Sequence, residues 1–373
     1  MAKIAFIDVT VTVSFGGVQT AVWRLSETLC DMGHEVHVLG GDGDLRPYTP
    51  NPNLHVHTFP FKPREKVLDL GSRYRRIVER RSMSKHARDT LVEIDPDWVV
   101  LTKPFDFHWP GLMPSDSKVR FAFMSGGTDF CMGDRKLAKD VDAWVACSHF
   151  NAWQIRAHYK RQPKVMYNGV DVDAFAPSED SASVRAELGV EPSTCLFAFA
   201  GRLVGWKGIA IAIKAMAEKP MQAQDAKLLL IGDGEQQAEL QALAKRLDVA
   251  DRVIFYGRVD HKALPAYYSA IDVGVFPSIG DEAFGITIAE AMSCAKPVIA
   301  SHIGGIPEVV GNEGSCGLLV GPEDPVALAE NMALLAADKD LRERMGQAAR
   351  ERICNLYTWH MSARRMLDAM AVD

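Results

Sequence analysis

Apolar runs alternate with helix-forming segments in two blocks along the chain, and this alternation constrains the fold more than any other feature. The runs are continuously apolar, which is typical of strands buried on both faces of a parallel sheet. Two blocks of alternating strands and helices predict an α/β protein with two doubly wound sheets. The predicted strands are Lys3–Asp8, Glu35–Leu39, Trp98–Leu101, Arg120–Met124, Ala143–Cys147, Lys164–Tyr167, Leu196–Ala200, Lys227–Ile231, Val253–Tyr256, Val273–Phe276 and Pro297–Ala300. The predicted helices include Val18–Met32, Ile209–Ala217, Gln236–Leu247 and Ile286–Cys294.

The boundary between the blocks is predicted near Asn168-Gly169, because an Asn-Gly pair is a turn signal. The chain has 373 residues, which suits two domains of ordinary size. Its first residues read as a strand and not as a signal peptide, and no apolar run reaches the roughly 18 residues of a membrane helix. Seven scattered cysteines without a C-x-x-C pattern are typical of reduced thiols in a cytosolic protein.

Two glutamates eight residues apart, Glu282 and Glu290, flank the point where a loop gives way to a helix. A strand runs into Pro277, the loop carries Glu282, and Phe284 and Gly285 open the helix that holds Glu290. A helix start offers unpaired N–H groups and the positive end of a dipole, which suits phosphate. Carboxylates beside such a start suit sugar hydroxyls. The arrangement predicts a nucleotide-sugar site, and the alternative is a pair of simply solvated carboxylates.

A second predicted phosphate site follows the strand that ends at Ala200. Gly201 and Gly208 flank a loop that carries Arg202 and Lys207, and an apolar helix begins directly after it. A guanidinium can fork onto phosphate oxygens, and an ammonium supplies a point charge. The loop therefore has the parts of a phosphate-binding turn. The alternative is an ordinary surface loop with basic residues.

These two motifs together resemble those of the retaining GT-B glycosyltransferases of family 4, and the resemblance extends over nearly the whole chain. Its motifs are Phe15-Gly16-Gly17-Val18-Gln19, Tyr167-Asn168-Gly169-Val170-Asp171, Gly201-Arg202-Leu203, Lys207-Gly208, Leu230-Ile231-Gly232-Asp233-Gly234, Val253-Ile254-Phe255-Tyr256-Gly257, Glu282-Ala283-Phe284-Gly285 with Glu290, and Gly304-Gly305-Ile306-Pro307-Glu308.

The resemblance implies a GT-B fold, with two doubly wound Rossmann-like domains that face a central cleft. It implies an N-terminal acceptor-binding domain over residues 1–168, to which a terminal helix in residues 357–373 crosses back. Residues 169–356 are then the nucleotide-sugar-binding domain. Ligands of open parallel sheets sit beyond the carboxyl ends of the strands, and the glycine and charged motifs follow such ends.

The activity implied by the resemblance is transfer of a sugar, with retention at the anomeric carbon, from a nucleotide sugar that we expect to be a UDP-sugar. The expected acceptor is a glycan or a lipid-linked acceptor in cell-envelope polysaccharide or glycolipid synthesis. Two cations and a helix dipole stabilise the departing diphosphate, so neither a metal nor a cofactor is expected. The implied catalytic residues are Arg202, Lys207 and Glu282, with Asp129 and His108 as candidates on the acceptor side. The implied donor-binding residues are Gly16, Gly17, Gly232, Gly234, Gly257, Arg258, Phe284, Gly285, Ile286 and Glu290.

One departure from the family lies after the predicted strand Arg120–Met124. Many members carry a histidine there, near the reacting sugar and the acceptor, whereas this chain continues Ser125-Gly126-Gly127-Thr128-Asp129. Asp129 or His108, each after a strand of the first block, is the candidate replacement, and either can equally be structural. The departure leaves the acceptor side of the mechanism open.

Other cofactor patterns are weak in this sequence. Gly232-Asp233-Gly234 is half of a dinucleotide fingerprint and lacks the third glycine. Three Asp-x-Asp pairs, at 42–44, 95–97 and 171–173, are interpreted as turn or surface residues. His55 and His57 alternate along a short strand-like run and are interpreted as surface histidines. No Cys/His spacing typical of a zinc site is present.

Basic residues concentrate between Lys62 and Arg88. This stretch contains ten Lys or Arg and three acidic residues, although the chain as a whole carries a net charge of −6. An acidic chain of this kind is not expected to bind nucleic acid. Apolar residues interleave with the cations of this stretch, so it predicts weak contact with an anionic membrane. The alternative is a solvated helical face. The expected location is the cytoplasm, with peripheral contact at the inner face of the membrane.

Two other functions are compatible with the sequence. A GT-B epimerase of nucleotide sugars would convert or hydrolyse the donor with no acceptor present. A degenerate transferase would serve as a binding or scaffold subunit. The missing histidine favours the scaffold, whereas the complete set of Arg202, Lys207, Glu282 and Glu290 argues against it.

Overall fold

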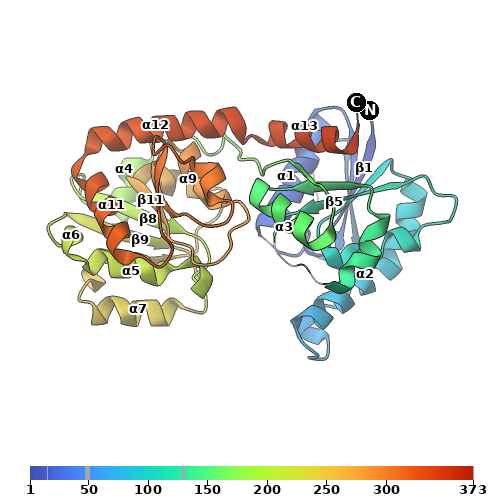
Figure 1. Ribbon diagram of the computed structural model, residues 1–373, viewed down its shortest axis with the longest axis horizontal. Helices are drawn as coiled ribbons and strands as arrows, with labels where there is room; N and C mark the ends of the chain where they lie inside the picture. Colours follow the sequence, from blue (N-terminus) through green and yellow to red (C-terminus); the bar gives the residue numbers. More distant parts are fainter. Residues whose placement is uncertain (15, 47–50, 128–129, 131, 373) are drawn as a thin grey trace. The chain divides into compact units, whose positions relative to one another are not determined.

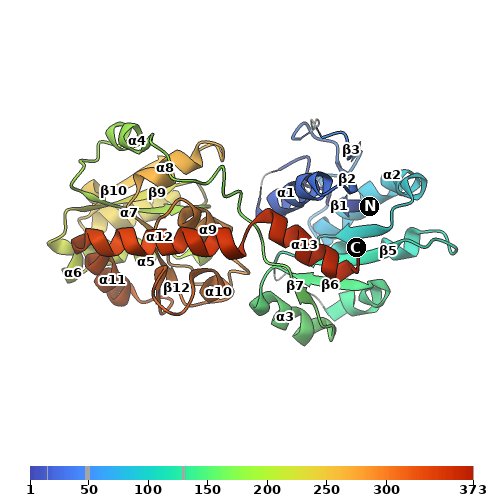
Figure 2. The same cartoon turned by 90° about the horizontal axis from the view of Figure 1, so that it is seen from above.

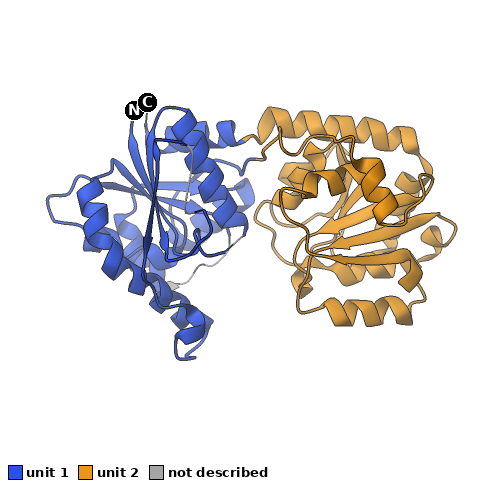
Figure 3. Cartoon of the chain, turned by 180° about the vertical axis from the view of Figure 1, so that it is seen from behind, with its two compact units in different colours: residues 1–169, 359–373 blue, residues 170–358 orange. Residues whose placement is uncertain are grey.

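The computed structural model describes residues 1–14, 16–46, 51–127, 130 and 132–372. The chain divides into two compact units (Figure 3). Unit 1 comprises residues 1–169 and 359–373, and unit 2 comprises residues 170–358. Each unit is built around one parallel sheet, as the alternation of apolar runs and helices predicts.

The sheet of unit 1 has the strand order β3-β2-β1-β4-β5-β6-β7. Helices α1 and α13 pack together on one face (Figure 2), and α2 and α3 contribute to the apolar core on the other. The strands are β1 Lys3–Ile7, β2 Glu35–Gly41, β3 Leu54–Phe59, β4 Trp98–Leu101, β5 Arg120–Ser125, β6 Ala143–Ala146 and β7 Lys164–Val165. The helices are α1 Gly17–Asp31, α2 Ser72–Ile94, α3 His149–Tyr159 and α13 Trp359–Met370, with short 3₁₀ turns that include Pro104–Asp106.

The sheet of unit 2 has the order β10-β9-β8-β11-β12-β13. Helices α5 and α7 cover one face, whereas α9 and α12 cover the other (Figure 1). The strands are β8 Cys195–Ala200, β9 Ala226–Ile231, β10 Val253–Gly257, β11 Val273–Phe276, β12 Val298–Ser301 and β13 Gly317–Val320. The helices are α4 Ser181–Glu187, α5 Ile209–Ala217, α6 Lys219–Gln222, α7 Gln237–Arg246, α8 Leu264–Ala270, α9 Ile286–Ser293, α10 Ile306–Val310, α11 Pro325–Ala337 and α12 Lys339–Leu356.

Every predicted strand is present. Two further strands are not among the predicted ones, although the run around His55 and His57 looks strand-like in the sequence. These are β3, Leu54–Phe59, and β13, Gly317–Val320. Both lie at a sheet edge. Polar side chains interrupt β3, and β13 is only four residues long, so its apolar run is short. Among the described helices, none combines the length and the apolarity that crossing a membrane requires.

Candidate active site

In the sheet of unit 2, the strand order reverses its direction of growth between β8 and β11. In open parallel sheets, ligands bind at such a switch point, beyond the carboxyl ends of the strands. Gly201 and Arg202 directly follow β8, and Pro277 begins the loop that leads from β11 to Glu282. The fold therefore brings together two loops that lie about 80 residues apart in the sequence.

The loop after β8 is held against its neighbours by backbone contacts. The N–H of Leu203 donates to the carbonyl of Asp233 (2.7 Å), and the N–H groups of Ile279 and Gly280 donate to the carbonyl of Trp206 (2.9 and 3.1 Å). Gly208 ends the loop with φ 67°, and a Cβ at this position would collide with the carbonyl of Pro277. Only glycine permits this close approach. The fixed loop leaves the Arg202 side chain exposed and turns Lys207 toward the loop after β11.

Lys207 and Glu282 form an ion pair at the switch point, from Nζ to Oε2. Their side chains are 16% and 17% exposed, so the pair is shielded from much of the solvent. The ammonium also lies 4.3 Å from the centroid of the Trp206 ring. On the other side, the Gly305 N–H donates to the carbonyl of Glu282 (2.7 Å), which fixes the glutamate backbone. A positive and a negative group are thus held together where a ligand of this fold would bind.

Helix α9 begins beside this pair. Gly285 precedes the helix with φ 95°, a left-handed conformation that suits glycine. The preceding Phe284 is buried, and the centroids of its ring and the Tyr357 ring are 5.6 Å apart. The Gly285 carbonyl accepts from the N–H groups of Ile288 and Ala289 (both 3.1 Å), so the first N–H of the helix belongs to Ile286. A helix start of this kind favours an anion.

Glu290 lies in the second turn of α9 and is only 4% exposed. One carboxylate oxygen lies 2.9 Å from Nε2 of His261, whose side chain is 48% exposed. Burial, and then the nearby Glu290 carboxylate, raise the pKa of Tyr268 well above its ordinary value. The phenol therefore stays neutral beside the glutamate. His261 is absent from the sequence prediction, because nothing in its local pattern links it to a glutamate 29 residues away.

The remaining donor-binding candidates of unit 2 lie at the ends of β9 and β10. The N–H of Gly232 donates to the carbonyl of Gly257 (2.7 Å), and the carbonyl of Gly234 accepts from Gln237 (3.1 Å). The exposed Arg258 lies 3.7 Å from the Asp233 carboxylate, from Nε to Oδ2. Since β9 is the direct neighbour of β8, these residues line the same edge of the sheet as Arg202.

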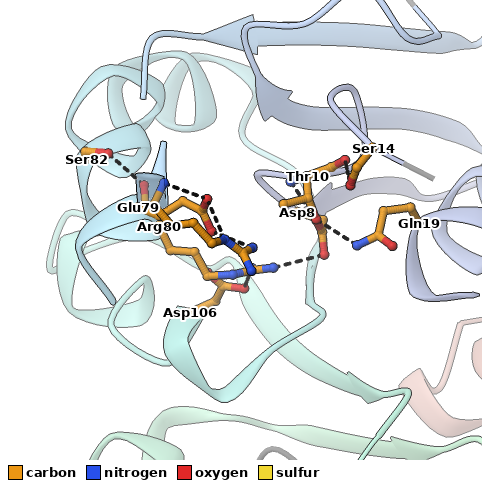
Figure 4. A network of polar contacts seen from close by, with 9 residues as sticks. Asp8, Thr10, Ser14, Gln19, Glu79, Arg80, Ser82 and Asp106 are labelled. Atoms are coloured by element: carbon orange, nitrogen blue, oxygen red, sulfur yellow. Dashed lines mark hydrogen bonds and ion pairs between the residues drawn. The ribbon is translucent and has the colours of Figure 1, made fainter. Parts of the chain in front are cut away.

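In unit 1, Gly16 and Gly17 lie at the start of α1, next to the end of β1. The carbonyl of Gly16 accepts from Thr20 (2.9 Å). Gln19 donates to the Thr10 hydroxyl (2.7 Å), and that hydroxyl donates to the Asp8 carboxylate (2.6 Å). This chain of hydrogen bonds leads from the glycine loop to a buried group of charges (Figure 4).

That group consists of Asp8, Arg80 and Asp106, and it lies at the switch point of the first sheet, between β1 and β4. Arg80 extends from α2 between the two carboxylates, with 3.1 Å to Asp8 and an ion pair to Asp106 (Figure 4). Thr102 donates to Asp8 at 2.5 Å. Arg80 is interpreted from the sequence as part of a basic surface stretch, and this is wrong, because its side chain is 5% exposed.

The two carboxylates respond differently to the shared guanidinium. Burial alone would raise the pKa of Asp8, but Arg80 and the Thr10 and Thr102 hydroxyls outweigh it and lower the pKa to about 2. Burial raises the pKa of Asp106 to about 7, and the nearby Asp8 charge adds to this effect against the attraction of Arg80. The two carboxylates thus share one guanidinium, and Asp106 ionises less readily than Asp8.

The two acceptor-side candidates are placed differently. Both ring nitrogens of His108 have partners in unit 1, the carbonyl of Phe105 and the hydroxyl of Ser84, each at 3.0 Å. Burial lowers the pKa of His108 to about 4, so its ring is neutral at pH 7. A role toward an acceptor stays a prediction for His108. Asp129 lies outside the described residues.

Comparison with known proteins places this site in a family. Residues 180–352 match the family described as glycosyl transferases group 1, and residues 15–174 match glycosyltransferase family 4. Among solved structures, sucrose-phosphate synthase from Thermosynechococcus elongatus has a TM-score of 0.84 at 24% identity, covering 100% of this chain and 98% of that one. The structure of Anabaena Alr3699/HepE in complex with UDP and glucose has a TM-score of 0.82 at 22% identity and covers 100% of both chains.

Two parallel α/β sheets with these structural neighbours define a GT-B fold made of two Rossmann-like domains. The chain belongs to the group 1 glycosyltransferases of the family 4 type. A D-inositol 3-phosphate glycosyltransferase from Segniliparus rotundus is 36% identical over 225 residues, which are 58% of this chain and 49% of the relative. The matched segments span about half the length of the first curated relatives.

Proposed function

We propose that the protein transfers a sugar from a nucleotide sugar to an acceptor, with retention at the anomeric carbon. The observation that carries this proposal is the Lys207–Glu282 pair at the switch point of unit 2, beside the start of α9. Departure of a nucleoside diphosphate builds negative charge on its outer phosphate. Arg202, Lys207 and the N–H groups at Ile286 supply fixed positive charge for that phosphate, which is electrostatic catalysis.

The carboxylates have the complementary role. We assign the sugar hydroxyls to Glu282, which shares the switch point with Lys207, and the ribose hydroxyls to Glu290. Phe284, Gly285 and Ile286 are assigned to the diphosphate, as are Gly232, Gly234, Gly257 and Arg258 at the neighbouring strand ends. Gly16, Gly17, His108 and Asp129 of unit 1 are assigned to the donor phosphate and the acceptor.

The donor base is proposed to be uracil, and the acceptor a glycan or a lipid-linked acceptor of the cell envelope. A protein with the same fold was solved in complex with UDP and glucose, which supports testing UDP-sugars first. The curated relative is named for D-inositol 3-phosphate, so a small polar acceptor belongs in the same screen.

The transfer is proposed to need no metal, because Lys207, Arg202 and the α9 start supply the positive charge that a metal would otherwise give. Two aspartates of the Asp-x-Asp pairs already accept hydrogen bonds from backbone N–H groups. Asp97 accepts from the Lys3 N–H (2.8 Å), and Asp171 accepts from the Ala174 N–H (3.1 Å).

We therefore expect turnover of one nucleotide sugar among UDP-, GDP- and ADP-sugars to persist in EDTA. Release of the nucleoside diphosphate, with and without an acceptor extract, is the readout. Loss of turnover in EDTA that Mg²⁺ or Mn²⁺ restores would contradict metal independence. Conversion of the donor sugar to its epimer without an acceptor would identify an epimerase, and absence of turnover with every donor would favour a scaffold.

Contact with an anionic membrane is proposed for residues 62–88, and the structure narrows the residues that can make it. At least five of the ten cations form ion pairs within unit 1, namely Arg64 with Glu79, Arg73 with Asp134, Arg75 with Asp69, Arg80 with two aspartates, and Arg88 with Asp89. Lys66, Arg81 and Lys85 are exposed. Leu68 and Leu70, just before α2, are 71% and 63% exposed, so apolar side chains accompany the charge.

The triple variant Lys66→Gln, Arg81→Gln, Lys85→Gln is expected to lose co-sedimentation with anionic vesicles at low salt. Attraction near such a surface is worth about 1 kcal/mol per cation and decays over the Debye length. Arg80 must be left in place, because removing it would strand two buried carboxylates at a cost of roughly 3–5 kcal/mol.

The matched control is Lys214→Gln, Lys219→Gln, Lys245→Gln, which removes the same charge from exposed positions of unit 2. It should sediment like the wild type. If the wild type never sediments with anionic vesicles at low salt, residues 62–88 are a solvated face.

A further inference from the structure

We propose that Glu35, His37 and His55 form a binding site for a divalent transition-metal ion, with Zn²⁺ as the test ion. The three residues lie on β2 and β3, which pair in parallel at the edge of the sheet in unit 1. His37 is the direct register partner of His55, and Leu39 is the partner of His57. Because side chains alternate between the faces of a strand, Glu35, His37, His55 and His57 all project from one face.

The ligand atoms are already close together. One ligand atom from each of Glu35, His37 and His55 lies within 4.8 Å of the others. Nε2 of His37 is 2.9 Å from Oε1 of Glu35, and the rings of His37 and His55 stack with centroids 4.8 Å apart. Ligands about 2.0–2.1 Å from a tetrahedral Zn²⁺ lie about 3.3 Å from one another, so small side-chain rotations are enough to admit the ion.

His57 contacts the ring nitrogen of His37 that does not face Glu35. Its Nε2 lies 3.0 Å from Nδ1 of His37, and the two rings stack with centroids 5.3 Å apart. When Nε2 of His37 binds the ion, Nδ1 carries the proton and donates it to Nε2 of His57. A partner on the second nitrogen of a metal-bound histidine fixes the tautomer and the ring orientation.

The charges around the site act in opposite directions. The Glu35 carboxylate favours a cation, and carboxylates and neutral imidazoles are the forms that bind metals. Lys3 opposes binding, because its ammonium lies 3.9 Å from Oε1 of Glu35. It is also held by the carbonyl of Ile94 at 3.0 Å.

The ligand set points to a class of ion. Two imidazoles and one carboxylate suit Zn²⁺, Ni²⁺, Cu²⁺ or Co²⁺, whereas Mg²⁺ and Ca²⁺ prefer sites made only of oxygen. Three protein ligands leave a position for water. The ion would join edge strand β3 to β2, and an ion that binds only the folded chain stabilises it. The alternation of His55 and His57, interpreted from the sequence as a surface feature, is on this proposal part of a metal site.

The test is calorimetric titration of Zn²⁺ into protein freed of metal, with no nucleotide sugar present. We expect one saturable site in the wild type and at least a tenfold weaker affinity in both His37→Gln and His55→Gln. His57→Gln should weaken binding by roughly 10–100-fold, the scale for removing a hydrogen-bond partner of a metal ligand. The control His360→Gln removes an exposed histidine of α13 and should bind like the wild type.

Two further measurements distinguish loss of a metal ligand from loss of the fold. His55 is exposed, so His55→Gln is expected to fold normally. Lys3→Gln should tighten Zn²⁺ binding, an effect that damage to the fold would not produce. Co²⁺ should give the visible absorption of a low-coordinate site in the wild type and lose it in His55→Gln. The proposal is overturned if the wild type shows no saturable Zn²⁺ site, or if His37→Gln and His55→Gln bind like His360→Gln.

Discussion

Replacing Lys207 by alanine is expected to lower kcat by roughly 10²–10³-fold, the scale for removing one group that stabilises a transition-state charge. The physical reason is the position of the ammonium, which the β8–α5 loop holds at the switch point beside the start of α9. Arg202→Ala is expected to lose a similar factor, because its guanidinium follows the same strand. Steady-state release of the nucleoside diphosphate from the donor identified by screening measures both.

The ion pair with Glu282 gives this prediction a sharper form. Lys207→Ala leaves the Glu282 carboxylate without its partner, so part of the loss could come from a displaced glutamate. Comparing Lys207→Ala in the wild type and in a Glu282→Gln background separates the two effects. If Lys207 acts on the leaving phosphate, the same factor is lost in both backgrounds. Near-normal turnover in both Lys207→Ala and Arg202→Ala would refute the proposal that these two cations stabilise the leaving phosphate.

The two glutamates are expected to separate the parts of the donor. Glu290→Ala should weaken binding of the bare nucleoside diphosphate by roughly 10–100-fold, since a hydrogen bond to a charged group is worth about 1.5–3 kcal/mol. Glu282→Ala should leave that affinity nearly unchanged and weaken only the intact nucleotide sugar. Calorimetry with both ligands on both variants is the measurement.

His261→Ala serves as the control for this pair, because His261 contacts Glu290 and is itself half exposed. It should affect the diphosphate less than Glu290→Ala does, since the carboxylate remains. Equal loss of diphosphate affinity in Glu282→Ala and Glu290→Ala would refute the division between sugar and ribose.

The sequence predicts the fold well where a strand is buried on both faces. Central strands such as β8 and β11 are buried along their whole length, so their apolar runs locate them to within a residue. The edge strand β3 carries His55, His57 and Thr58 among its six residues, so it has no continuous apolar run and only the alternation around the two histidines indicates it. Loops that follow strand ends can also be predicted, because parallel strands place all their carboxyl ends on one edge.

Contacts between distant residues could not be predicted in the same way. The sequence places Lys207 and Glu282 each at a strand end but does not show that they form an ion pair across 75 residues. It reads Arg80 as one more cation of a basic helix, because a buried arginine is recognised only by partners such as Asp8, which lies 72 residues away. The histidines of β2 and β3 are brought together only by strand register, which the apolar pattern leaves open.

The switch point of unit 2 is proposed to bind a nucleoside diphosphate sugar. Thermal denaturation of the wild type and of Lys207→Ala with UDP, GDP, ADP and their sugars tests it most directly. A ligand at 100 times its Kd adds about 2.7 kcal/mol to the stability of the folded protein. We expect the melting temperature of the wild type to rise by several degrees with the nucleotides of one base, and that of Lys207→Ala to rise less. The absence of a rise with every nucleotide, or an equal rise in both proteins, would contradict it.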